Sequence, residues 1–159
     1  NEVENRIERT IESLNDCRSA ARSLGIPDPM PVLQGFEPSD YVSGPFFQNK
    51  IPDLVGIGSV CRRHLKGKNG LMAVFDAVNT ALPKHVGIHL FGVKGTALRE
   101  IVKTFSSRKI SSDSMAYQYA ARWEAFKNKT PKNSEMLYRH AEKWLNDNKT
   151  FESEQINLF

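Results

Sequence analysis

The chain has 159 residues, of which 40% are hydrophobic and 25% are charged, proportions that exclude a disordered or fibrous protein. Its 22 Lys and Arg residues against 18 Asp and Glu residues give a net charge of +4, which allows a polyanionic partner without requiring one. Cys17 and Cys61 form no CxxC pair, so neither a disulfide scaffold nor a Cys-rich zinc site is expected. No signal-peptide pattern or long apolar run is present, and we expect a cytoplasmic protein without membrane contact.

The first predicted element is a long amphipathic helix over residues 2–24. Apolar side chains recur there at helical spacing, and Gly25 follows as a stop signal. The apolar stripe consists of Val3, Ile7, Ile11, Leu14, Cys17, Ala21 and Leu24. The same spacing predicts further helices over residues 70–82 and 96–105.

Four short apolar runs, each ending at a polar residue or a glycine, are predicted to be buried strands. They cover residues 31–35, 53–57, 85–91 and 109–112. The helices predicted over residues 70–82 and 96–105 separate the last three runs from one another. Strands that alternate with helices indicate βα units and a parallel sheet.

After the fourth strand the pattern becomes wholly helical. Two helices are predicted over residues 115–127 and 133–146, and Ser134 is a candidate N-cap for the second. We therefore divide the chain into an α/β unit over residues 1–127 and a C-terminal helix and tail over residues 128–159.

Four strands are half of what a closed (β/α)₈ barrel needs, since that fold has eight strands and takes about 250 residues. The chain is therefore expected to be either half of such a barrel or a smaller open α/β sheet. In the first case the other strands come from upstream in a longer chain or from a partner subunit. The first residue is Asn1 rather than Met, which suggests a chain that is cut from something longer or processed.

The ends of the four strands hold the residues that can carry chemistry. In parallel α/β folds the loops at the carboxyl ends of the strands present their side chains to one crevice. These ends are Gln34-Gly35, Gly58-Ser59, Phe91-Gly92 and Asp113. An amide reads a purine edge, glycines allow close backbone approach, an aromatic ring stacks on a base, and a carboxylate can attack an anomeric carbon. The set suits a planar polar ligand.

Each of these side chains also has a purely structural interpretation. Asp113 precedes a predicted helix, where a carboxylate often caps the helix start. Gln34 can satisfy loop backbone groups, and Phe91 can be a core aromatic residue. An aromatic stripe on the helix after Asp113 is interpreted as helix packing. Its residues are Tyr117, Tyr119, Trp123 and Phe126.

A basic cluster follows the second strand end. Arg62, Arg63 and Lys66 are well placed for phosphate contacts if the crevice binds nucleic acid. A solvated basic loop is the alternative. His85 and His89 lie on one face of the third strand and are interpreted as structural residues, so we expect no metal site.

Four segments, in this order, resemble the last four strands of tRNA-guanine transglycosylases. They are residues 31–35 (PVLQG), 55–60 (VGIGSV), 89–93 (HLFGV) and 112–117 (SDSMAY). The sequence is most similar to the relatives that place 7-deazaguanine in DNA, through the GIGSVCRR stretch at residues 56–63. The resemblance covers about residues 25–125 and implies the C-terminal half of a TIM-type barrel with a helical C-terminal extension.

The resemblance implies that Asp113 is a covalent nucleophile. It would attack C1′ of a guanine nucleotide, expel guanine and hold a glycosyl-enzyme intermediate, which a 7-deazaguanine such as preQ0 then attacks. Gln34 and the backbone at Gly58 and Ser59 would contact the base, and Phe91 would stack on it. The implied substrate-binding set is Gln34, Gly35, Gly58, Ser59, Phe91 and Gly92. No cofactor is implied.

Three departures from the tRNA enzymes make DNA the expected nucleic acid. The aspartate that serves as general acid and base in the first half of the barrel has no counterpart, so this chain alone should be inactive. The zinc motif after the nucleophile strand is absent, and residues 115–119 (MAYQY) replace the segment that reads the tRNA anticodon loop. A tRNA-modifying enzyme and a non-catalytic subunit that binds nucleic acid or nucleobases are the alternatives.

Overall fold

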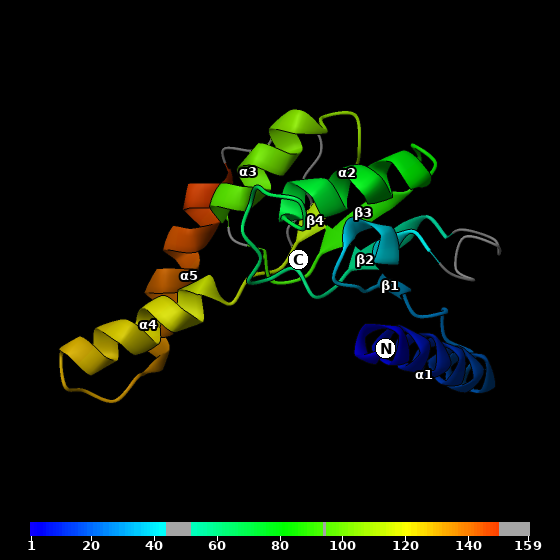
Figure 1. The fold of residues 1–159 in the computed structure, drawn as a ribbon. Helices are drawn as coiled ribbons and strands as arrows, with labels where there is room; N and C mark the ends of the chain where they lie inside the picture. Colours follow the sequence, from blue (N-terminus) through cyan, green and yellow to red (C-terminus); the bar gives the residue numbers. More distant parts are fainter. Residues whose placement is uncertain (44–51, 94, 150–159) are drawn as a thin grey trace.

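The computed structural model describes residues 1–43, 52–93 and 95–149. Within these residues a four-stranded parallel sheet is accompanied by five α-helices and a short 3-10 helix (Figure 1). The strands are β1 (Val32–Leu33), β2 (Leu54–Ile57), β3 (Gly87–Leu90) and β4 (Ile110–Ser112). The helices are α1 (Glu2–Leu24), α2 (Leu71–Ala81), α3 (Gly95–Thr104), α4 (Ala116–Lys127), α5 (Ser134–Lys149) and the 3-10 helix η1 (Pro38–Tyr41). The predicted α/β class and parallel sheet are confirmed.

The strands pair in chain order, β1-β2-β3-β4, and every pair is parallel. The last residues of neighbouring strands are in register, because Leu33 pairs with Ile57, Ile57 with Leu90, and Leu90 with Ser112. All four carboxyl ends therefore meet at one edge of the sheet. A strand order without reversal is that of a barrel wall, whereas doubly wound sheets reverse their order at the ligand crevice.

The two faces of the sheet differ in chemistry. One face packs its branched side chains with α2 and α3, which lie on the same side of the strands (Figure 1). Its strand residues, at most 1% exposed, are Val55, Ile57, Ile88, Leu90 and Ile110. Successive side chains of a strand point to opposite faces, so the other face carries Val32, Leu54, Gly56, Gly87, His89 and Ser111. That second face mixes apolar side chains with glycines and with the polar pair of His89 and Ser111.

The helix at the start of the chain forms as predicted. Asn1 Oδ1 accepts hydrogen bonds from the backbone N–H groups of Val3 and Glu4 at 2.9 and 3.1 Å. Gly25 ends α1 with a φ of 67°, a left-handed conformation that glycine adopts without steric cost. No helix among the described residues is long and apolar enough to cross a membrane.

The start of α5 differs from the prediction. Asn133 Oδ1 accepts a hydrogen bond from the Met136 N–H at 2.9 Å, whereas Ser134 is already the first helical residue. The predicted N-cap at Ser134 is therefore wrong by one position. Either residue type can cap a helix, and only the backbone path selects Asn133.

The helices α4 and α5 pack against each other at the end of the described chain. Ala121 and Ala125 of α4 are buried, and Glu124 accepts hydrogen bonds from Arg139 and His140 of α5, both at 2.7 Å. These hydrogen bonds lower the pKa of the Glu124 carboxyl below its ordinary value of 4.5. The division of the chain after residue 127 stays a prediction.

The four aromatic residues of α4 do not pack as predicted. Tyr119, Trp123 and Phe126 are 70%, 51% and 72% exposed, and only Tyr117 of the four aromatic residues is half-buried. The side of α4 that faces α5 is made of alanines and Glu124 instead. Aromatic spacing marks a continuous helix face, but it does not say whether a partner element covers that face.

Candidate active site

A row of four residues follows the last paired residue of each strand. The row consists of Gln34, Gly58, Phe91 and Asp113. Because the strand ends are in register, these residues lie side by side at the carboxyl edge of the sheet. Strand alternation places them on the face opposite the hydrophobic core. The four strand ends singled out in the sequence therefore come together.

Asp113 lies at the β4 end of this row and faces the end of β3. Its Oδ1 atom accepts a hydrogen bond from the Gly92 N–H at 2.8 Å and lies 3.5 Å from His89 Nε2. The Asp113 side chain is 48% exposed. One carboxylate oxygen is thus anchored, while the group as a whole remains accessible to a ligand.

Asp113 does not act as a helix cap. The residue in the N-cap position of α4 is Met115, which makes no side-chain capping bond. The N–H of Ala116 is bonded to Ser114 Oγ at 3.2 Å. The capping interpretation of Asp113 is therefore wrong, because the carboxylate is turned toward β3 instead of toward the helix start.

His89 is the part of this site that sequence reasoning missed. Its Nδ1 atom lies 2.9 Å from Ser111 Oγ, while its Nε2 atom faces Asp113. The ring stands edge-on to Phe91, with centroids 4.7 Å apart and an interplanar angle of 72°. His89 precedes Phe91 on the glycine-rich face of β3, and that polar alternation was the available signal.

Gly92 has to be a glycine for two independent reasons. Its φ of 66° is left-handed, and a Cβ there would lie 2.8 Å from the Cβ of Cys61, which is closer than real Cβ contacts. Since its N–H group is bonded to Asp113, Gly92 positions the carboxylate. Because Gly92 also lies close to Cys61, the loop after β2 runs next to Asp113.

Gln34 and Ser59 are joined at the other end of the row. Ser59 Oγ lies 2.7 Å from Gln34 Oε1, and Ser59 adopts a left-handed φ of 57°, which is uncommon outside glycine. The N–H of Gly58 is already used, because it donates to the Leu33 carbonyl at 2.9 Å. The Gly58 carbonyl lies 3.2 Å from the Tyr41 hydroxyl.

Arg63 has a different role from the phosphate contact expected from the sequence. Its guanidinium donates to the carbonyls of Ser59, Phe36, Asn69 and Gly35 and to the Tyr41 hydroxyl. A guanidinium has five N–H groups, so all of them are used. Arg63 therefore fixes the β1 and β2 end loops to each other, and the expectation that it binds phosphate is corrected.

Tyr41 of η1 completes this clamp. It is only 1% exposed, and its hydroxyl donates to the Gly35 carbonyl at 2.9 Å. Burial raises the pKa of the Tyr41 phenol above its ordinary value of 10.0, although Arg63 opposes this shift. A Cβ at Gly35 would lie 2.4 Å from the Cβ of Asp40, so the turn into η1 requires glycine.

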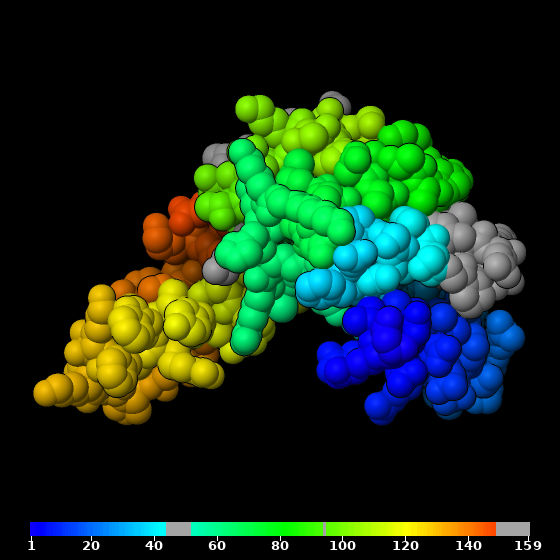
Figure 2. Space-filling view, in the orientation of Figure 1, coloured from blue at the N-terminus to red at the C-terminus, as the bar shows by residue number. Residues whose placement is uncertain are grey.

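A cavity of about 600 Å³ opens beside the β1 and β2 ends. Gln34, Ser59, Arg62 and Lys66 line it, together with Gly35, Arg63 and the first turns of α1. Asp113 does not line this cavity. The loop after β2, which includes the cavity residue Cys61 next to Gly92, forms a ridge between η1 and α4 (Figure 2).

Comparison with known proteins identifies the family. The family described as DpdA, DeoxyPurine in DNA protein A, matches residues 2–148. A search for similar curated proteins and solved structures found none. The match spans the sheet, the strand-end row and most of α5. The chain therefore belongs to the DpdA family, DeoxyPurine in DNA protein A.

Proposed function

We propose that this chain supplies the nucleophile of a base-exchange transglycosylase that replaces guanine in DNA with a 7-deazaguanine. The observation that carries the proposal is the Asp113 carboxylate, which the Gly92 N–H holds at 2.8 Å in an accessible position of the strand-end row. Membership of a family described by deoxypurine in DNA supports DNA as the substrate. A carboxylate is a suitable nucleophile at an anomeric carbon.

The proposed reaction is a double displacement at C1′ of a deoxyguanosine. In the first step a bond forms between an Asp113 carboxylate oxygen and C1′, while the bond from C1′ to N9 breaks and guanine leaves with the electron pair. Because Oδ1 is held by Gly92, we assign the attack to Oδ2. A general acid protonates the leaving guanine. In the second step N9 of a deprotonated 7-deazaguanine attacks C1′ and displaces the carboxylate, which restores the original stereochemistry.

The remaining groups of the site are assigned by position. Gln34 and Ser59, linked at 2.7 Å, are proposed to read the base edge. Phe91 is proposed to stack on the base, since its ring lies across the sheet face, where a Cβ at Gly56 would meet it at 2.7 Å. Arg62 and Lys66 line the adjoining cavity and are proposed to bind phosphates.

We further propose that the sheet is the C-terminal half of a (β/α)₈ barrel. The unreversed strand order supports this, because the strands of a (β/α)₈ barrel follow one another in chain order. The other four strands, with the general acid, would come from a longer chain or from a partner subunit.

The test is incorporation of labelled preQ0 by the complete enzyme into single-stranded DNA, duplex DNA and tRNA. Asp113→Asn should abolish incorporation into DNA. Asp53→Asn removes the same charge from an exposed position at the opposite edge of the sheet and should leave incorporation unchanged. Single-stranded DNA should be the best substrate, because reaching C1′ in a duplex requires the base to be extruded, at a cost of about 2 kcal/mol or more.

Retained activity in Asp113→Asn would refute the nucleophile assignment. Preferential labelling of tRNA would instead support the tRNA-modifying alternative. If no nucleic acid is labelled although DNA binds, the chain would be a non-catalytic subunit.

A further inference from the structure

An exposed face of α4 remains outside the site described above. We call Tyr119, Trp123 and Phe126 the aromatic stripe of α4. Their side chains are 70%, 51% and 72% exposed, and the rings of Trp123 and Phe126 are stacked with centroids 5.5 Å apart and planes 20° apart. Rings of this size usually lose most of their exposure on folding, so a flat apolar surface at this place marks a contact site.

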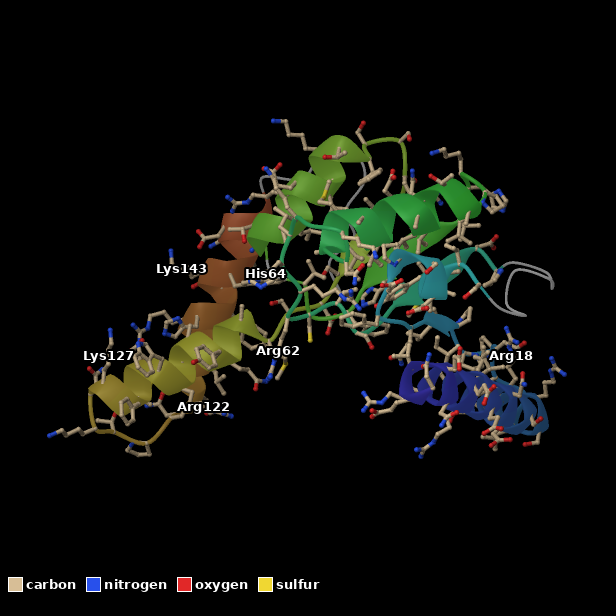
Figure 3. All side chains as sticks on the ribbon, in the orientation of Figure 1. Arg18, Arg62, His64, Arg122, Lys127 and Lys143 are labelled. Atoms are coloured by element: carbon tan, nitrogen blue, oxygen red, sulfur yellow. The ribbon has the colours of Figure 1, made fainter. Side chains whose placement is uncertain are left out.

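The charge on this face is positive. Arg122 is exposed in the middle of the stripe, and Lys127 Nζ lies 5.6 Å from the centroid of the Trp123 ring. Figure 3 shows both cations on α4, with Arg62 on the loop after β2. Among the 12 residues of α4 the acidic one is Glu124, and it faces α5, where Arg139 binds it.

The position of α4 connects this surface to Asp113. The helix begins three residues after Asp113 and leads away from the sheet (Figure 1). Tyr119 and Phe126 are seven residues apart, which is about 10 Å along a helix. That length matches two or three stacked bases at a rise of about 3.4 Å each.

We propose that the aromatic stripe of α4, with Arg122 and Lys127, binds one strand of DNA next to the nucleotide that Asp113 attacks. Stacking of bases on aromatic rings, together with cations for the phosphates, is how proteins hold single strands without reading their sequence. The two cations of this face, Arg122 and Lys127, complement the phosphates of a DNA strand, and a protein partner is one of the outcomes of the test. The choice of DNA as the nucleic acid rests on the proposed function, whereas the binding itself does not need Asp113.

The experiment measures the fluorescence anisotropy of a labelled single-stranded oligodeoxynucleotide with the full protein. The double variant Tyr119→Ser/Phe126→Ser should weaken binding by about tenfold or more, which corresponds to the loss of roughly one stacked base. The variant Tyr119→Phe/Phe126→Tyr keeps both rings and should bind as the wild type does. Circular dichroism checks that α4 is retained in each variant.

The electrostatic contribution to DNA binding is tested by varying the salt concentration. Arg122→Gln/Lys127→Gln should reduce the slope of log K against log salt concentration by about 0.7 for each lost phosphate contact. Lys84→Gln/Lys109→Gln removes the same charge from exposed positions at the amino edge of the sheet and should leave the slope unchanged. Tyr138→Ser replaces an equally exposed aromatic residue of α5 (70%). It is the control for the Tyr119→Ser/Phe126→Ser variant and should leave DNA binding unchanged.

The outcomes separate this proposal from the proposed function. Asp113→Asn should bind the oligonucleotide normally, so a loss of catalysis alone leaves this proposal standing. Unchanged binding by the Tyr119→Ser/Phe126→Ser variant, or no binding by the wild type, would overturn it. A lower oligomeric mass for that variant in light scattering, with DNA binding unchanged, would also overturn it and assign the stripe to a second protein copy.

Discussion

The His89 side chain connects two strands at the proposed catalytic residue. Its Nδ1 atom lies 2.9 Å from Ser111 Oγ, and its Nε2 atom lies 3.5 Å from Asp113 Oδ1. We assign His89 as a positioning residue that, together with the Gly92 N–H, fixes the direction in which the carboxylate points. The His89 side chain is only 12% exposed, which limits the competition of water for its contact with Asp113.

Replacing His89 by Asn or Gln tests this assignment. The amide nitrogen of Gln reaches the position of Nε2, whereas that of Asn reaches only the position of Nδ1. His89→Gln should therefore keep most of the activity, while His89→Asn should slow adduct formation by about 100-fold, the effect of a misplacement of about 1 Å. Single-turnover kinetics measures the rate, and KM for the oligonucleotide should not change in either variant. Equal loss in both variants would show that only packing is affected.

Individual site residues differed in how far the sequence could predict them. The positions of Gln34 and Asp113 at the strand ends were predicted, because a strand end is a position that the apolar pattern defines, while their functional roles stay predictions. Arg63 was taken for a phosphate ligand, since basic sequence composition does not show that five protein acceptors surround one guanidinium. The role of His89 was not predicted, because it depends on contacts with Ser111 and Asp113. The register of the strands, which the sequence does not show, sets the distances of those contacts.

Among the elements, α2, β3 and β4 are held together by a buried arginine. Arg108 has 0% exposure and donates to Asn79 Oδ1 and to the carbonyls of Asn79, Leu82, Pro83 and Val86. Burial lowers the pKa of this guanidinium below its ordinary value of 12.5. The carbonyl oxygens at the end of α2 carry the negative end of the helix dipole, which compensates the buried charge.

Arg108→Met should destabilise the fold by on the order of 3 kcal/mol, because several buried carbonyls lose their donors. Chemical denaturation followed by circular dichroism measures the free energy of unfolding. Arg9→Met at an exposed position of α1 is the matched control and should stay within about 0.5 kcal/mol of the wild type. Equal stability of the two variants would contradict the proposed role of Arg108.

The contact between α4 and α5 should depend on pH through Glu124. The folded state lowers the pKa of this carboxyl through hydrogen bonds from Arg139 and His140. A lowered folded-state pKa means that the unfolded state binds more protons, so this stabilisation is complete above the ordinary value of 4.5 and is lost as the pH falls through the folded-state pKa. Wild-type Tm should exceed that of Glu124→Gln at pH 6, and the difference should vanish at low pH. A constant difference over that range would contradict this account.

Element types followed closely from the sequence, because apolar periodicity separates strands from helices. The residues of α1 were predicted to the residue, since Gly25 marks its end. The loop that contains η1 had no periodic signal, and the face of α4 that meets α5 could not be chosen. The aromatic residues at Tyr119, Trp123 and Phe126 suggested packing, yet the alanines make the contact, because small side chains let two helices approach closely.

At the scale of the whole molecule, the candidate functional residues lie along one edge of the sheet. Parallel pairing in chain order brings the four strand ends into register, with Gln34 at one end of the row and Asp113 at the other. The cavity lies on the β1 side and the aromatic stripe begins on the β4 side. A DNA strand laid along this edge would meet base-reading groups, the nucleophile and the stacking surface in turn.

The central claim is that Asp113 bonds covalently to the sugar during base exchange. The most direct measurement is tandem mass spectrometry of the complete enzyme after reaction with a guanine-containing single strand, denaturation, and digestion by protease and nuclease. We predict a deoxyribose-phosphate adduct on the peptide that contains Asp113, which disappears when preQ0 is added before denaturation. An adduct on another residue, or base exchange by Asp113→Asn at the wild-type rate, would contradict the account.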